Sequence, residues 1–97
     1  MTDHAHLVRI AHMRPTPGQR ERLIARLNGQ AEAMRSLPGL FGVQVCEVQE
    51  EPGSVALISR WRDEEAMQAA DQGQTSAAIQ SAAELIEHED VRHLVSV

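Results

Sequence analysis

The fold is decided by residues 38–61, PGLFGVQVCEVQEEPGSVALISRW. Two apolar runs, 41–49 and 54–61, are joined by an acidic segment that ends in Pro52-Gly53. Valine, isoleucine and aromatic residues favour β-strands, and a Pro-Gly pair marks a turn. The stretch therefore predicts an antiparallel β-hairpin that ends on Trp61, the one tryptophan of the chain.

A strand and a helix are predicted before the hairpin. Residues 5–13 alternate as a strand does, with apolar residues on both faces, and Pro15 stops its hydrogen-bond ladder. A helix of about twenty residues then runs from Pro17-Gly18 to Pro38-Gly39, which end it. Because such a long connection is a crossover, the first two strands are expected to run parallel.

A helix and a last strand are predicted after the hairpin. Asp63 is a suitable helix N-cap, and Gly73 interrupts the helix. A second helical piece is expected over about 75–87, with strand four from Val91 to Val97. The order β-α-β-β-α-β predicts one α+β domain, residues 1–97, with a ferredoxin-like fold and an antiparallel four-stranded sheet.

The sheet face away from the helices also reads as apolar in all four strands. A second copy of the chain would bury it, so we expect a homodimer.

Composition excludes several classes of function. The net charge of −5 and the aromatic content of 2% argue against nucleic acid as a partner. No apolar run reaches the length of a membrane span, and the first residues do not resemble a signal peptide. Cys46 is a single cysteine, so a cytoplasmic location is expected and the thiol is taken as inert.

Short motifs along the whole chain resemble one known family. They are Pro17-Gly18, the stretch 38–42, the Glu-Pro-Gly turn, residues 55–58 leading to Trp61, and residues 62–66. Together they resemble the antibiotic biosynthesis monooxygenase family of dimeric α/β barrels. The resemblance implies a homodimer whose two sheets face each other. It also implies, from several members, a cofactor-independent oxidation of quinols or polycyclic phenols.

The chain departs from the haem-degrading branch of that family. By resemblance, the haem-degrading members carry Asn, Trp and His at the positions where this chain has Ala11, Ala70 and Gln80. The resemblance therefore implies no haem degradation. Gln80, at the position of a family histidine, is instead taken as a substrate contact.

Two charged or titratable positions on strand one are candidate catalytic residues. Arg9 shares a face with apolar residues, so it needs a partner; it could bind a carboxylate or phenolate, or pair with an acid such as Glu47. His12 lies near the end of strand one and His93 in strand four, which are neighbours in this fold. Either histidine could take a phenolic proton, or could be hydrogen-bonded at the dimer seam.

Trp61 is the candidate aromatic contact. It could stack on a flat ligand, or it could hold sheet and helix together as a core residue, which is the commoner role. Residues 3–6 and 88–90 carry histidines and acids without recognised ligand spacing, so no metal site is expected.

The leading hypothesis is a cofactor-free monooxygenase of electron-rich phenols, with a small pocket between sheet and helices. Arg9, His12 and Trp61 are its candidate residues, and a small aromatic molecule is the expected ligand. The alternative is a non-enzymatic binding or structural dimer of the same fold.

Overall fold

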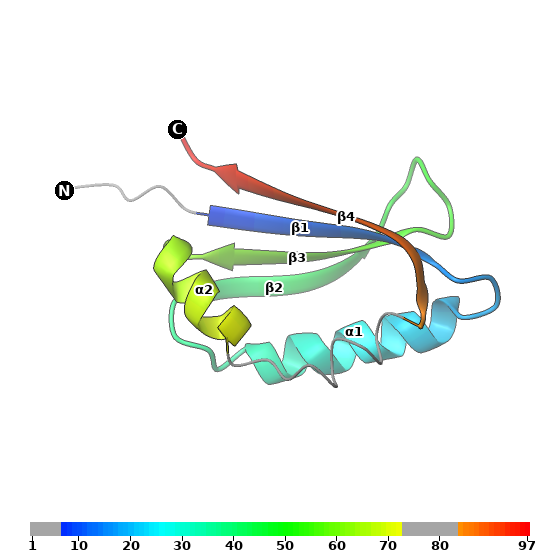
Figure 1. The fold of residues 1–97 in the computed structure, drawn as a ribbon, viewed down its shortest axis with the longest axis horizontal. Coiled ribbons are helices and arrows are strands. Elements are labelled where there is room, and N and C mark those ends of the chain that lie inside the picture. The colour runs from blue at the N-terminus through cyan, green and yellow to red at the C-terminus, as the bar shows by residue number, and fades with distance from the viewer. Residues whose placement is uncertain (1–6, 73–83) are drawn as a thin grey trace.

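The computed structural model describes residues 7–72 and 84–97. Its elements follow the predicted order β-α-β-β-α-β. They are β1 (Leu7–Pro15), α1 (Arg20–Met34), β2 (Leu40–Glu47), β3 (Val55–Trp61), α2 (Glu64–Gln72) and β4 (Ile86–Val95). The fold is ferredoxin-like and of the α+β class, as the sequence predicts (Figure 1).

The four strands form one sheet in the order β2-β3-β1-β4, and every neighbouring pair is antiparallel. β1 and β2 both run antiparallel to β3, so they run parallel to each other without touching. This confirms the direction that the crossover helix predicts.

The hairpin closes on the predicted turn between β2 and β3. The Ser54 N–H donates to the Glu51 carbonyl at 2.9 Å, with Pro52 and Gly53 between them. Gly53 has a φ of 97°. A positive φ in this third position of a turn favours glycine, and proline suits the second position, so the sequence and the turn geometry agree.

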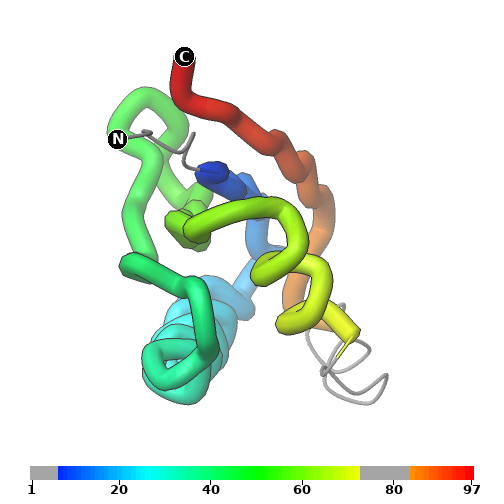
Figure 2. Tube along the Cα trace, turned by 90° about the vertical axis from the view of Figure 1, so that its left-hand side faces the viewer, coloured from blue at the N-terminus to red at the C-terminus, as the bar shows by residue number. Residues whose placement is uncertain are grey.

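Both helices cover the same face of the sheet (Figures 1 and 2). On β1 that face carries the odd-numbered residues, among which Leu7, Ala11 and Met13 are buried. Helix α1 adds its apolar stripe of Leu23, Leu27, Ala31 and Met34, and α2 adds Ala66 and Met67. The core is therefore one layer between sheet and helices.

The opposite face is only partly apolar. Val8, Ile10 and Ile58 are half-buried there in the single chain. On β4 the same face carries His88, Asp90 and Arg92, all exposed, with Leu94 as its apolar member. The prediction of an apolar second face in all four strands is therefore wrong for β4, because its alternation puts charged residues on that side.

Helix α1 is shorter than the sequence predicts. It begins at Arg20 and ends at Met34, four residues before Pro38-Gly39. The Leu37 N–H bonds to the carbonyl three residues earlier, that of Met34, at 2.9 Å. Such a tight turn ends an α-helix before the proline is reached.

Strand β4 begins earlier than predicted. Ile86, which falls within the helical piece predicted over about 75–87, instead pairs with Pro15 at the end of β1. The long β1 strand offers a ladder there, and the Thr16 N–H donates to the Leu85 carbonyl at 2.9 Å. Tertiary pairing thus overrides a local helical pattern. The predicted break at Gly73 and most of the second helical piece lie outside the described residues.

Candidate functional site

The strand register brings Arg9 to the face of the sheet that the helices cover. Arg9 lies opposite Ser59 on β3 and His93 on β4. Residues that are directly opposite in an antiparallel pair share a face, so these three side chains lie on the helix side. The site is built outward from Arg9.

Asp71 on α2 is the main partner of Arg9. Nη1 of Arg9 donates to Oδ1 at 2.8 Å and Nη2 donates to Oδ2 at 2.7 Å. Two parallel hydrogen bonds between a guanidinium and a carboxylate form a strong, directional ion pair. The start of α2 is fixed by Asp63, whose Oδ1 accepts the Ala66 N–H at 2.8 Å. The N-cap predicted from the sequence therefore sets the position of Asp71 two turns later.

His93 completes the cluster from β4. Nε of Arg9 donates to Nε2 of His93 at 3.1 Å. Nε2 is therefore the unprotonated nitrogen, as assigned from this hydrogen bond, and the imidazole is neutral. One strand at the centre of the sheet, one edge strand and one helix each contribute one side chain, and we call Arg9, Asp71 and His93 the arginine cluster.

Charge interactions in the arginine cluster shift two pKa values. The hydrogen bonds from Arg9 lower the pKa of the Asp71 carboxyl, against the opposing effect of partial burial, and the positive charge of Arg9 lowers it further. The hydrogen bond to Asp71 raises the pKa of Arg9. Asp71 therefore stays ionised well into the acidic range.

Arg9 keeps hydrogen-bonding capacity for a ligand. A guanidinium has five N–H donors, and the bonds to Asp71 and His93 use one on each of its three nitrogens. Its side chain is 25% exposed and that of Asp71 is 43% exposed. Within residues 7–72 and 84–97 the other two N–H groups have no hydrogen-bond partner, which leaves them for an oxygen atom of a ligand.

The structure separates Arg9 from His12. His12 lies opposite Asp90 on β4, so it is on the other face of the sheet. There its Nε2 is 3.2 Å from Oε2 of Glu51, whose Oε1 also meets Arg14 at 3.3 Å. Arg9 and His12 cannot act on one substrate within one chain, and a catalytic role for His12 stays a prediction.

Trp61 is buried in the core. The residue is 1% exposed, and its Nε1–H donates to Oγ of Ser59 at 2.9 Å. The indole thus has its one polar atom satisfied inside the protein. This geometry supports the core role of Trp61, and a stacking role stays a prediction. The substrate contact expected for Gln80 also stays a prediction, because Gln80 lies outside the described residues.

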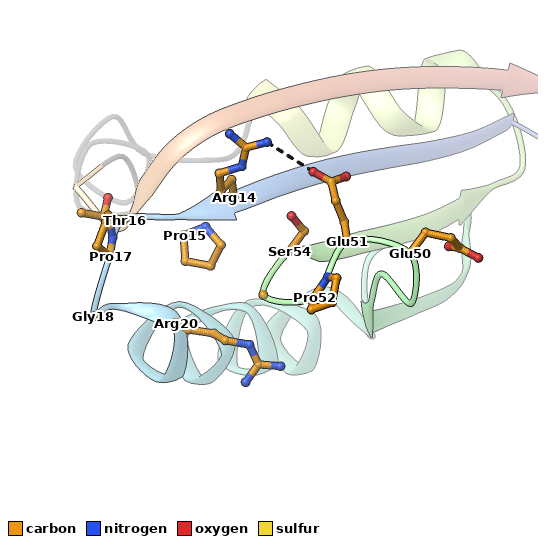
Figure 3. A pocket seen from close by; sticks show the side chains of 11 residues that line it. Arg14, Pro15, Thr16, Pro17, Gly18, Arg20, Glu50, Glu51, Pro52 and Ser54 are labelled. Atoms are coloured by element: carbon orange, nitrogen blue, oxygen red, sulfur yellow. Dashed lines mark hydrogen bonds and ion pairs between the residues drawn. The ribbon is translucent and has the colours of Figure 1, made fainter.

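A hollow of about 420 Å³ lies at the opposite end of the sheet from Trp61. It is bordered by the loop before α1 and by the turn between β2 and β3 (Figure 3). Figure 3 shows Arg14 reaching from β1 to the carboxylate of Glu51 at its rim. Neither Arg9, His12 nor Trp61 lines it, so it is separate from the expected pocket between sheet and helices.

The predicted partner of Arg9 was wrong. Glu47 pairs with Arg20 of α1 at 3.1 Å instead. Asp71, the actual partner, was missed. One signal was available in the sequence: Asp71 lies four residues after Met67, and it follows Ala70, so the acid borders the inner stripe of the predicted helix.

Two further features can be checked on the described residues: a group of metal-ligating side chains and a helix long enough to span a membrane. Within 7–72 and 84–97 no three histidine, cysteine, aspartate or glutamate side chains are grouped so as to hold a metal ion. In the same ranges no helix is long and apolar enough to span a membrane.

Comparison with known proteins assigns the family. The family model described as antibiotic biosynthesis monooxygenase matches residues 6–89. The chain belongs to this family. The resemblance inferred from the sequence motifs is thereby confirmed.

Solved structures agree with this assignment. A candidate antibiotic biosynthesis monooxygenase of Chloroflexus aurantiacus J-10-fl is 29% identical, with a TM-score of 0.76 over 95% of this chain and 93% of that one. Rv0793 of Mycobacterium tuberculosis is 21% identical, with a TM-score of 0.84 over 95% of both chains. A protein of unknown function from Nitrosomonas europaea, NE2512, is 19% identical, with a TM-score of 0.82 over 99% of this chain and 93% of that one. The last two show the fold alone.

No functionally curated protein matches the sequence significantly. The resemblance aligns Ala11 and Ala70 with functional groups of haem-degrading relatives, and both residues are apolar. Ala11 is 8% exposed in the core, and Ala70 packs against that core. Neither methyl group can bind a haem iron or donate a hydrogen bond.

Proposed function

We propose that this chain is a cofactor-independent monooxygenase of electron-rich phenols, in which Arg9 binds the substrate oxygen and His93 takes its proton. One observation carries the proposal: the 3.1 Å hydrogen bond between Nε of Arg9 and Nε2 of His93, on the helix face of the sheet. It brings a donor and a base within reach of one oxygen atom. Membership of the antibiotic biosynthesis monooxygenase family supports the reaction class.

Binding begins when the phenol oxygen takes the place of Nε2 as acceptor for Arg9. The freed lone pair of Nε2 then accepts the phenolic proton. Asp71 stabilises the imidazolium that forms, since its carboxylate interacts favourably with a positive charge on His93. The cluster stays neutral as a whole, because the phenolate and the imidazolium appear together. A positioned base of this kind contributes roughly 10²–10⁴-fold to a rate.

Oxidation then needs only the substrate and dioxygen. The phenolate gives one electron to O₂, and the resulting radical pair joins through a new C–O bond at a ring carbon that bears hydrogen. Loss of that hydrogen as a proton and cleavage of the O–O bond release water and leave a quinone. One oxygen atom enters the product and the other leaves in water, so a phenol and O₂ balance a quinone and H₂O.

A homodimer is part of the same proposal. The half-buried apolar residues Val8, Ile10 and Ile58 form a patch on the face without helices. A two-fold pair would bury this patch against its own copy. The proposed phenol site lies on the other face, so each protomer keeps its own arginine cluster.

Oxygen uptake with 1-naphthol tests the reaction, because this electron-rich phenol has a free para carbon and yields a coloured quinone. The purified chain is expected to speed uptake well above the spontaneous rate. Arg9→Gln and His93→Gln should each lower kcat/KM by roughly 10²-fold. Arg35→Gln is the matched control, since Arg35 is also paired, with Glu32 at 3.0 Å, but lies just after the end of α1 and outside the arginine cluster.

Unchanged uptake in both cluster variants would overturn the assigned roles. Binding of 1-naphthol without any oxygen uptake would identify the alternative from the sequence, a non-enzymatic binding module.

A further inference from the structure

Asp71 occupies the position on Arg9 that a carboxylate ligand would take. Arginine recognises carboxylates by a fork of two parallel hydrogen bonds. In this chain the fork is filled from within, by Oδ1 and Oδ2 of Asp71 at 2.8 and 2.7 Å. An external carboxylate would have to displace Asp71 or bind beside it.

The net charge of the arginine cluster also disfavours a carboxylate ligand. Arg9 and Asp71 cancel, and His93 is neutral when it accepts from Arg9. Glu89 adds a further acid on the same face of β4, opposite Met13. A carboxylate on the ligand would therefore meet the carboxylate of Asp71 at short range, where like charges repel. An uncharged hydroxyl meets no such repulsion and can accept a hydrogen bond from Arg9.

The surroundings of His93 suit an aromatic ring. Val91 and Val95 lie two residues to either side of it, on the same face of the strand. They are 44% and 58% exposed, so apolar surface flanks the imidazole. A ring whose hydroxyl reaches Arg9 would have apolar contacts there.

We propose that Asp71 is a specificity-determining residue that makes the Arg9–His93 site accept uncharged phenols and reject aromatic carboxylates. The inference rests on the proposed function only in using the same site. It concerns binding and not oxidation, so the two can fail separately.

Two ligands of nearly equal shape test it: meta-hydroxybenzamide, which is neutral, and meta-hydroxybenzoate, which is an anion. Binding of each to the full chain is measured by calorimetry in the absence of oxygen. The parent protein is expected to bind the amide at least about tenfold more tightly than the benzoate. Asp71→Asn frees the fork of Arg9, so its affinity for the benzoate should rise by about tenfold or more and the preference should reverse.

Two further variants serve as controls. In Arg9→Gln/Asp71→Asn the gain in benzoate affinity should disappear, because the cation that attracts it is gone. Asp90→Asn removes an acid from the opposite face of β4, where it pairs with Arg92 at 3.2 Å. That variant should keep the preference of the parent.

Each remaining outcome overturns the inference. These are a parent that prefers the benzoate, a parent that binds neither ligand, and an Asp71→Asn protein that folds but keeps the parental preference. If circular dichroism shows that Asp71→Asn does not fold, Asp71→Ser is used in its place. A parent protein that prefers the benzoate overturns the inference whichever variant is used. Reversed selectivity without oxygen uptake would sustain this inference and overturn the monooxygenase. Oxygen uptake together with an Asp71→Asn protein that keeps the parental preference would sustain the monooxygenase and overturn this inference.

Discussion

Asp71 on α2 holds Arg9 on β1 by two hydrogen bonds of 2.8 and 2.7 Å, across 62 positions of sequence. This pair ties the short second helix to the centre of the sheet. It also decides the charge of the site that Arg9 offers to a ligand.

The first prediction concerns the stability that this pair supplies. Because Arg9 lowers the folded-state pKa of Asp71, the contribution is fully present above the unfolded value of about 3.9 and is lost as pH falls through the lower folded value. With both side chains partly exposed, Asp71→Asn should cost only about 1 kcal/mol near neutral pH. Urea unfolding near pH 7 and near pH 2 should show the difference between the two proteins shrinking in acid.

Asp90→Asn is the control for that experiment, since its partner Arg92 is 75% exposed and the pair should contribute almost nothing. A stability difference for Asp71→Asn that persists unchanged in acid would show that the ion pair is not its cause.

The second prediction concerns Trp61, which is 1% exposed. Truncation of a buried aromatic residue costs roughly 3–5 kcal/mol, a large part of the stability of a small domain. Trp61→Ala should therefore lower the melting temperature sharply, and Trp61→Phe should recover most of it. If Trp61→Ala melts like the parent but loses ligand binding or oxygen uptake, Trp61 is a wall of the substrate site and not a core residue.

The third prediction compares two glycines. Gly39 and Gly53 have positive φ values of 80° and 97°. A Cβ on Gly39 would lie 2.5 Å from the Cβ of Ala66 on α2, whereas one on Gly53 would meet nothing within 4 Å. Gly53→Ala should cost about 1–2 kcal/mol for the left-handed backbone alone. Gly39→Ala should cost clearly more, because α2 must also move away.

Thermal unfolding of the two variants side by side measures this difference. Equal costs would mean that α2 can shift freely relative to the loop before β2.

The fourth prediction concerns assembly. Sedimentation at micromolar concentration should show a dimer, and Ile58→Glu should give a folded monomer because it puts a charge into the apolar patch. Val95→Glu is the control and should leave the dimer intact, because Val95 lies opposite Leu7 on the helix face, where it is 58% exposed. A parent protein that sediments as a well-folded monomer would remove the barrel from the proposal.

The fifth prediction is that haem is left intact. The resemblance implies that Ala11, Ala70 and Gln80 stand where haem-degrading relatives carry Asn, Trp and His. Incubation with haem and a reductant should leave the haem absorption spectrum unchanged over time. Conversion to a linear tetrapyrrole would mean that other residues of the chain do this chemistry.

The sequence by itself determined the order of elements, the hairpin and the helix start. Each of these depends on neighbouring residues: alternation in 54–61, the turn at Pro52-Gly53, and the cap at Asp63. It also predicted that Arg9 lies on an apolar face and needs a partner. Local spacing carries this information because a strand turns every second side chain to the same side.

Only the tertiary structure decided which residues meet. His12 and His93 both looked available to one site, but the register pairs His12 with Asp90 and Arg9 with His93. A shift of one residue between β1 and β4 would have put the two histidines on one face. That register is fixed by packing across the whole sheet, and the position of Asp71 by the docking of α2 on the core. Neither depends on the residues nearby in sequence, so the arginine cluster appears only when the chain is folded.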